Sequence, residues 1–410
     1  MTTHYLLTTF GSSGDVYPML GLAKELQRRG HRVSLATNAH FESACQANDV
    51  EFHALGTSEE FEASIRNPDL WKPNKAFVHV FRCLMPVVRR QYELIRSLRE
   101  QGPLVTISNC LALGARMAHE KLNIPNVTIH LQPAVLWSRF DPPTLPNVFG
   151  PKWLRNLLYK LGCRFVVNPV SLPFVNEWRA ELELPPIRSL PEWWHSPSLV
   201  VCLFPEWFAP KQPDWPANLV QTDFPLWNDQ SGKGLAPELA RFVTAGPPPV
   251  VFAAGTGNIH GASFFRAAAG ACEQAGLRGI LLTKFAEQLP QNLSANILYV
   301  PYVPLDDLLP SCAALVHHGG IGTMSQALAA GIPQLIMPLA HDQFDNAARV
   351  RTLGCGDSLV PARFTAPRVA SMLQRLLNTP NVLQAATVMK SHMRKHDGLS
   401  AAVDAIERLR

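Results

Sequence analysis

The stretch FGSSGDVYPMLGLAKEL, residues 10–26, follows an apolar run and leads into a helical pattern, as the first loop of an α/β domain does. A glycine loop before a helix usually binds phosphate through backbone N–H groups and the positive end of the helix. Asp15 lies in the middle of this loop, where it would repel a phosphate. Two interpretations remain: Asp15 is a general base, or it caps a helix that starts near Pro18.

A second glycine loop, HHGGIGT, follows the buried-type run Ala313–His317 and precedes a helical pattern. Free backbone N–H groups at a helix start, the Thr323 hydroxyl and the His318 imidazole together suit a diphosphate. The Walker lysine is absent from this loop, which excludes a P-loop NTPase. His317 and His318 could bind zinc, but adjacent strand residues point to opposite faces and no third ligand is evident. We expect His317 to be structural and no metal to be bound.

Alternating strand-like and helix-like segments precede and follow these loops, which predicts parallel sheets wrapped by helices. In the first half the segments are 5–9, 18–29, 32–36, 41–48, 104–108, about 111–122 and 127–130. In the second half they are PPPVVFAAGTG, residues 247–257, a strand that meets a glycine loop, then 263–275, 279–283, 313–317, 322–330 and 334–337. Ligands of such sheets bind beyond the carboxyl ends of the strands. The fold class is therefore α/β.

The length of 410 residues fits two domains. Residues 133–225 are rich in proline and tryptophan; we expect them to contain helices and to cover one wall of a cleft. The expected boundaries are an N-terminal domain at 1–227, a linker at 228–236 (NDQSGKGLA), a C-terminal domain at 237–390, and a terminal helix at 391–410, for which packing back on the N-terminal domain is left open.

The composition, 47% hydrophobic and 17% charged with a net charge of +5, is typical of a soluble globular protein. Lysine and arginine are not interleaved with aromatic residues as in a nucleic-acid groove, so we expect no nucleic-acid partner. The eight cysteines are scattered without metal-binding spacing, and the sequence starts without a secretory pattern. We expect a cytoplasmic protein, with peripheral contact to the inner membrane face left open.

The segment YVPYVPLDDLLPSCAALVHHGGIGTMSQALAAGIPQLIMPLAHDQFDN, residues 299–346, resembles the nucleotide-sugar signature of family 1 glycosyltransferases. The likeness covers essentially the whole chain. It is strongest to the bacterial branch that contains sterol and antibiotic glycosyltransferases and, closest, the catalytic subunit of rhamnolipid rhamnosyltransferase, on the stretches WWHSPSLVVCLFPEWFAP, LLPSCAALVHHGGIG and AHDQFDNA. This resemblance implies a GT-B fold, in which two doubly wound Rossmann-like domains face each other across a cleft.

The resemblance also implies roles for residues that bind the donor, a nucleotide diphosphate sugar. These are Tyr302 and Val303 for the nucleobase, Gln326 for the ribose, His318, Gly320, Gly322, Thr323 and Thr256 for the diphosphate, and Asp342 and Gln343 for the sugar. Two alternatives remain: Tyr302 as core packing and Asp342 as a helix cap. Many plant members have glutamate at the position of Gln326. Because deoxyribose offers one hydroxyl fewer, glutamine here favours a dTDP-sugar such as dTDP-L-rhamnose.

Asp15 matches the position of the family's catalytic base, which implies an inverting transfer without metal or other cofactor. Ser12, Ser13 and Gly14 are possible further contacts of this loop, and Asn109 is a candidate supporting residue. In the water-poor site that this role implies, the pKa of Asp15 could rise above its usual value. A carboxylate base then removes the proton of the attacking hydroxyl.

The acceptor site is expected within residues 70–200, which are rich in large apolar side chains: Trp71, Phe77, Phe81, Met85, Trp137 and Phe140. By resemblance the acceptor is a hydroxyalkanoyl-hydroxyalkanoate lipid, which an acceptor-supplying enzyme could deliver. The alternative is a UDP-sugar-dependent glucosyltransferase acting on a sterol, polyketide or flavonoid. A nucleotide-sugar 2-epimerase and a binding protein without catalysis are less favoured.

The segment PKWLRNLLYKLGCRFVV, residues 151–167, has apolar residues at helical spacing with lysines and arginines among them. We expect an ordinary amphipathic helix that faces the core. A helix resting on a membrane surface, or a lid over a lipid chain, is the alternative.

Overall fold

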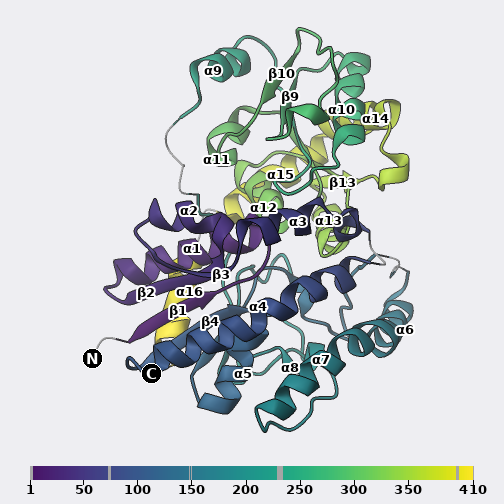
Figure 1. Ribbon diagram of the computed structural model, residues 1–410. Helices are drawn as coiled ribbons and strands as arrows, with labels where there is room; N and C mark the ends of the chain where they lie inside the picture. Colours follow the sequence, from purple (N-terminus) through teal and green to yellow (C-terminus); the bar gives the residue numbers. More distant parts are fainter. Residues whose placement is uncertain are drawn as a thin grey trace. The chain divides into compact units, whose positions relative to one another are not determined.

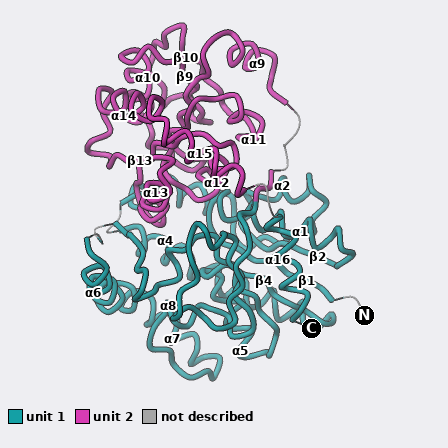
Figure 2. The backbone as a smooth tube through the Cα atoms, turned by 180° about the vertical axis from the view of Figure 1, so that it is seen from behind, with its two compact units in different colours: residues 1–225, 397–410 teal, residues 226–396 magenta. Residues whose placement is uncertain are grey.

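A computed structural model describes residues 3–72, 75–146, 148, 150–228, 234–393 and 397–409. The chain forms two compact units: unit 1 contains residues 1–225 and 397–410, and unit 2 contains residues 226–396 (Figure 2). Residues 229–233 of the expected linker lie outside the described residues. Each unit contains a wholly parallel sheet within its described part (Figure 1).

The sheet of unit 1 has the strand order β3-β2-β1-β4-β5-β6-β7. Its strands are β1 His4–Thr8, β2 Arg32–Asn38, β3 Glu51–Gly56, β4 Leu104–Asn109, β5 Asn126–His130, β6 Leu199–Cys202 and β7 Leu219–Gln221. The order reverses between β1 and β4, so the loops that follow these two strands diverge to opposite sides of the sheet. Such a switch point is where doubly wound sheets bind ligands, and the loop containing Asp15 follows β1.

The helices of unit 1 include one long helix and two helices that are joined by a π turn. They are α1 Ser13–Arg28, α2 Glu42–Gln46, α3 Ser58–Arg66, α4 Ala76–Arg99, α5 Leu113–Leu122, α6 Lys152–Gly162, α7 Asn168–Glu181, α8 Leu190–Trp193 and α16 Gly398–Glu407, with the π turn at Cys163–Val167. In the part of the chain that the structure describes, no helix combines the length and apolar character needed to cross a membrane.

Helix α1 begins earlier than the sequence predicted. Ser12 is its N-cap and Asp15 lies in its first turn, whereas the predicted start near Pro18 is inside the helix. Ser12 and Asp15 form a capping box, in which each side chain accepts a hydrogen bond from the other residue's backbone N–H. Because this box satisfies donors at the helix start, the helix extends past the position at which proline suggested a boundary.

Strands β6 and β7 come from the proline- and tryptophan-rich segment, where the sequence predicted only helices. A buried connection leads into β6: the Ser196 amide donates to Thr128 Oγ1 at 2.9 Å, and the Ser196 hydroxyl donates to the carbonyl of Asn126. Both partners belong to β5, the strand with which β6 pairs. These long-range bonds place β6 beside β5. The local sequence, four apolar residues close to prolines, does not by itself predict a strand.

Unit 2 has the strand order β10-β9-β8-β11-β12-β13, so its switch point lies between β8 and β11. Its strands are β8 Val250–Ala253, β9 Gly279–Leu282, β10 Ile297–Val300, β11 Ala314–His317, β12 Gln334–Ile336 and β13 Gly356–Ser358. Its helices are α9 Pro237–Thr244, α10 Ala262–Ala275, α11 Leu305–Leu308, α12 Ile321–Ala330, α13 Gln343–Thr352, α14 Ala366–Asn378 and α15 Pro380–Met393. Residues 391–393, expected in the terminal helix, end α15.

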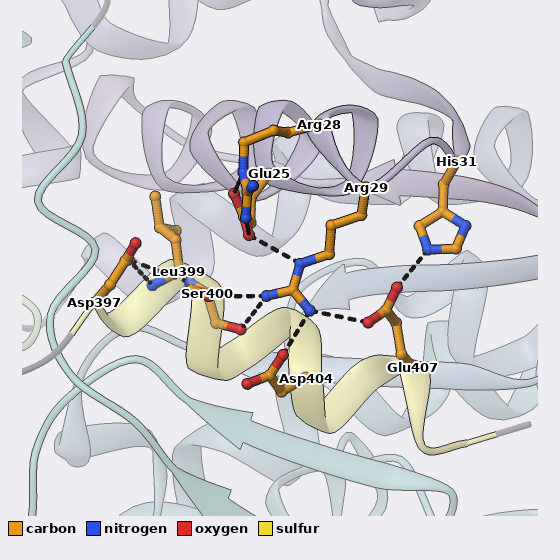
Figure 3. Close-up of polar contacts among 9 residues, drawn as sticks. All are labelled: Glu25, Arg28, Arg29, His31, Asp397, Leu399, Ser400, Asp404 and Glu407. Carbon is orange, nitrogen blue, oxygen red and sulfur yellow. Dashed lines mark hydrogen bonds and ion pairs between the residues drawn. The ribbon is translucent and has the colours of Figure 1, made fainter.

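Helix α16 brings the end of the chain back into unit 1, where it packs beside α1 (Figure 1). Figure 3 shows how Arg29, at the end of α1, joins the two helices. Its guanidinium contacts Asp404 at 2.5 Å and Glu407 at 2.9 Å, and it donates to the Ser400 hydroxyl at 2.8 Å. His31 adds a 2.6 Å contact to the second oxygen of Glu407. One side chain of α1 thus binds three positions along α16.

Arg29→Met should weaken this attachment while keeping an apolar stem of similar length. Asp404 and Glu407 would lose charged hydrogen bonds, and we expect the free energy of unfolding to fall by about 1–3 kcal/mol. Arg28→Met is the matched control, because Arg28 is exposed and its ion pair with Glu25 lies within α1. Urea denaturation measures both variants. Equal, small effects of the two substitutions would contradict the role assigned to Arg29.

Candidate functional site

His318 follows β11 at the switch point of unit 2, and its ring lies against two glycines. A Cβ atom on Gly255, after β8, would stand 2.8 Å from His318 Cε1, and one on Gly320 would stand 2.7 Å from Nε2. Gly255 also has a φ of +102°, which favours glycine. The imidazole therefore occupies a position that only glycine backbone permits on both sides.

The His318 imidazole is neutral at physiological pH. Burial, with a smaller contribution from His341, lowers the pKa of His318 to about 4. Its Nδ1 is buried and has no hydrogen-bond partner among the described residues. A neutral imidazole carries one N–H donor, so His318 can donate to an oxygen anion without itself adding a full positive charge.

Helix α12 begins at Ile321, three residues after His318, and the N–H groups of its first turn lack partners within the helix. Its N-cap is Gly320, whose lack of a side chain leaves no capping group there, and the first intrahelical bond of the helix runs from Met324 N to Gly320 O at 2.9 Å. The preceding N–H groups, including that of Gly322, sit at the positive end of the helix dipole. Thr323 adds a hydroxyl in the same turn. Residues 318–323 with Gly255 form what we call the anion site.

His317 has a structural role, as expected from the sequence. Its ring is fully buried, its Nε2 contacts Gln334 Oε1 at 2.9 Å, and its Nδ1 accepts from the Gly319 amide at 3.1 Å. These contacts place the proton on Nε2, and burial lowers the pKa of His317 to about 3. His317 thus holds the loop of the anion site at Gly319, whose φ is +96°.

Asn346 joins the anion site to the loop that contains Asp342 and Gln343. Its Nδ2 donates to Gly319 O at 2.9 Å and to Asp342 Oδ2 at 2.7 Å. The sequence analysis did not single out Asn346, although it lies in the quoted AHDQFDNA stretch. Asp342 occupies the N-cap position of α13 but makes no capping bond through its side chain, so the cap alternative is wrong. Its carboxylate is instead oriented by Asn346.

Gln343 is buried, and its amide oxygen is held by the backbone. Oε1 accepts from Leu339 N at 2.7 Å and from Ala340 N at 3.1 Å. The Nε2 group is therefore the end of this side chain that can donate to a ligand oxygen. The same two bonds fix the loop between β12 and α13, and Asp342 lies in this loop directly before Gln343.

The remaining predicted residues of unit 2 follow β8, β10 or the start of α12. Tyr302 is 47% exposed, so the alternative of core packing is wrong, and Lys284 Nζ lies 5.5 Å from its ring centroid. Val303 is buried, Thr256 is exposed and Gln326 is half-buried. Because Thr256, Tyr302 and Val303 follow the carboxyl ends of their strands, a ligand of the anion site can extend toward them. Lys284 was not predicted, since a lone lysine after a strand carries no local signal.

Asp15 lies at the switch point of unit 1, where the capping box holds its carboxylate. Oδ2 accepts from Ser12 N at 2.8 Å and from the Ser12 hydroxyl at 3.3 Å. A Cβ on Gly11 would stand only 2.2 Å from this oxygen. Ser12 and Gly14 are exposed, and Ser13 is half-buried. The side chain thus completes the cap of α1 and lies in the first turn of that helix, beside exposed residues.

Burial gives Asp15 the properties of a weak acid near neutral pH. It raises the pKa of Asp15 to about 6, although both hydrogen bonds from Ser12 oppose this change. Cys110, which follows β4, is close enough to interact electrostatically with the same carboxylate. Burial and the charge of Asp15 raise the pKa of the Cys110 thiol to about 12. Asn109 supports the loop by donating to Phe10 O at 2.9 Å. A carboxylate with this pKa can accept a proton at pH 7.

The expected acceptor wall is only partly available. Phe81 is buried in the core of unit 1, which is a correction to its predicted contact with a ligand. Phe77, Met85, Trp71 and Trp137 are half-buried, and Phe140 is exposed. Trp137 stacks on Tyr159 of α6 with ring centroids 5.2 Å apart. Of the six apolar residues predicted to form the acceptor wall, five are thus at least partly accessible and Phe81 is not.

Two family models match the chain. The glycosyltransferase family 28 N-terminal domain matches residues 5–137, and the erythromycin biosynthesis protein CIII-like C-terminal domain matches residues 279–403. These ranges contain the Asp15 loop and residues 318–323 of the anion site, respectively.

The chain is 28% identical to a sterol 3-beta-glucosyltransferase of Arabidopsis thaliana over 97% of its own length, which is 66% of that protein, and it spans 64% of a second such enzyme. It is 29% identical to the vancomycin aglycone glucosyltransferase of Amycolatopsis orientalis, over 98% of both chains.

Solved structures agree in fold. The glycosyltransferase of kitacinnamycin matches with a TM-score of 0.76 at 22% identity, covering 100% of this chain and 99% of that one. The spinosyn rhamnosyltransferase bound to thymidine diphosphate matches with a TM-score of 0.71 at 19% identity, covering 99% and 100%. The chain therefore has the GT-B fold, and sterol and antibiotic glycosyltransferases are among the proteins that it resembles in sequence.

Proposed function

We propose that the chain transfers a sugar, with inversion, from a nucleotide diphosphate sugar to a hydroxyl group of an apolar acceptor. The observation that carries the proposal is the anion site, where neutral His318 lies beside the uncapped start of α12. These donors match the charge that grows on a departing diphosphate. Asp342 and the Nε2 group of Gln343 bind the donor sugar, and Tyr302 stacks on the base.

Unit 1 supplies the base in this mechanism. The acceptor oxygen forms a bond to the anomeric carbon while the bond from that carbon to the diphosphate oxygen breaks. The hydroxyl proton passes to Asp15, whose pKa near 6 leaves it mostly ionised at pH 7. The negative charge of the leaving diphosphate goes to the donors of the anion site. No metal or other cofactor is needed for either step.

For the donor we propose a dTDP-sugar, with dTDP-L-rhamnose as the first candidate. The support is Gln326, half-buried on α12, and the likeness in fold to a rhamnosyltransferase bound to thymidine diphosphate. For the acceptor we propose a hydroxyalkanoyl-hydroxyalkanoate lipid. The alternative is a UDP-sugar-dependent glucosyltransferase acting on a sterol, polyketide or flavonoid, which the similarity to sterol and aglycone glucosyltransferases favours.

A panel of donors and acceptors separates these candidates. The protein is incubated with dTDP-rhamnose, dTDP-glucose or UDP-glucose and with a hydroxy fatty acid dimer, a sterol or a phenolic acceptor, and nucleoside diphosphate release is measured. We expect release to require both substrates and to be fastest with a dTDP-sugar. Turnover with UDP-glucose but with neither dTDP-sugar would overturn the donor assignment. If no pair of donor and acceptor gives acceptor-dependent release, the proposed function is wrong.

Gly255→Ala should weaken binding of nucleoside diphosphate by at least about ten-fold. The new methyl group would displace the His318 ring, and the backbone would be strained at a φ of +102°. Gly257→Ala is the matched control, since no atom lies within 4 Å of its added Cβ. Calorimetric titration with dTDP and UDP measures both variants, with thermal unfolding to check their fold. Unchanged affinity of folded Gly255→Ala would contradict the seating of His318.

Asp15→Asn should lower kcat by about 10²–10⁴-fold, because asparagine retains the shape but cannot take a proton. Ser12→Ala separates catalysis from capping: it should cost about 1 kcal/mol of stability and leave most of kcat. In wild type the ionised form is active, so kcat/KM should fall as the pH decreases through about 6. Ser12→Ala removes a bond that lowers the pKa of Asp15, so this limb should move to higher pH. Near-normal kcat in Asp15→Asn would leave Asp15 as a cap only.

A further inference from the structure

Helix α6 and the π turn after it expose a row of large apolar side chains. Trp153, Leu157, Leu161 and Phe165 follow at every fourth residue, and Trp153 and Phe165 are 68% and 66% exposed. We call this row the α6 face. The sequence favoured an amphipathic helix facing the core; this is wrong, because no residue of α6 is buried.

Contacts on the other side of α6 fix the direction in which this face points. Tyr159 stacks on Trp137, and Asn156 Nδ2 donates to Arg139 O at 2.8 Å. Arg155 donates to Pro142 O at 2.5 Å and to the Thr144 hydroxyl at 3.0 Å. The helix is therefore attached through its polar and half-buried side chains, while its largest apolar side chains point outward.

The charge around the α6 face has one sign. From Pro142 to Asn176 the chain contains no Asp or Glu, whereas it contains Lys152, Arg155, Lys160 and Arg164. Lys160 and Arg164 are exposed, and the Arg164 guanidinium carbon lies 5.6 Å from the Phe165 ring centroid. Lys152 forms an ion pair with a carboxylate, since its Nζ lies 3.6 Å from Asp141 Oδ1. Cations thus accompany the exposed aromatic residues along the helix.

We propose that the α6 face binds the surface of an anionic phospholipid bilayer. Exposed Trp, Leu and Phe enter the boundary between headgroups and acyl chains, and lysines and arginines beside them contact lipid phosphates. The row from Trp153 to Phe165 is about 18 Å long, which suits a helix lying in the plane of the interface. Charge complementarity selects this occupant, because the basic and apolar groups together match an anionic lipid surface. The proposal is independent of the proposed function.

Vesicle sedimentation tests the proposal on the full chain without substrates. Unilamellar vesicles of phosphatidylcholine with about 30% phosphatidylglycerol are compared with pure phosphatidylcholine, at low and high salt. We expect binding to the anionic vesicles that falls with salt, and much weaker binding to neutral ones. Lys160→Gln/Arg164→Gln should weaken binding by about twenty-five-fold, at about five-fold for each cation. Trp153→Ser/Leu157→Ser should abolish it.

Matched controls distinguish the α6 face from general surface properties. Arg66→Gln/Arg96→Gln removes two exposed cations elsewhere in unit 1, and Leu383→Ser/Val388→Ser removes two exposed apolar side chains of α15. We expect both controls to bind like wild type, and thermal unfolding to be similar in all four variants.

Three results would overturn the proposal. The first is that the wild type does not bind anionic vesicles at low salt, and the second is that the control variants lose as much binding as the α6 variants. The third is that the wild type is a dimer and that Trp153→Ser/Leu157→Ser dissociates it, which would assign the α6 face to a second copy. Because no step needs sugar transfer, a failure here leaves the proposed function intact. Transfer to a detergent-dispersed acceptor is measured separately.

Discussion

The close contact of the His318 ring with two backbone positions that lack Cβ atoms is the constraint on which the donor side depends. Gly255 follows β8 and Gly320 follows β11, so the imidazole holds together the two loops of the switch point in unit 2. The same arrangement buries the ring enough to keep it neutral. Asn346 extends this order to Asp342, and so the loop after β12 depends on it as well.

Local patterns predicted the alternation of strands and helices and the positions of His318 and Asp15, because glycine loops between a strand and a helix have characteristic residue types. Strands β6 and β7 escaped prediction, since their short runs lie among prolines; β6 is placed by bonds to β5, and β7 by pairing with β6. The Asn346–Gly319 bond is equally invisible, as it joins positions far apart in sequence. The early start of α1 was available in principle, because Ser12 and Asp15 have the spacing of a capping box; Pro18 was misleading.

Asp15 illustrates how one side chain can serve structure and chemistry together. The bonds from Ser12 stabilise the ionised carboxylate, while burial opposes ionisation, and the balance is a pKa near neutrality. A more exposed cap would be too acidic to take a proton effectively at pH 7, and a carboxylate without the Ser12 bonds would be less well oriented. The capping interpretation and the base interpretation are therefore compatible.

The attachment of α16 through Arg29 makes unit 2 an insertion in the sequence of unit 1. During synthesis, α1 and the strands of unit 1 leave the ribosome before unit 2, whereas Ala402 and Val403, both fully buried, follow it. Unit 2 is continuous from 226 to 396 and can complete its core while unit 1 still has an uncovered apolar surface. Deleting α16 would therefore damage the unit whose other residues precede unit 2 in the sequence.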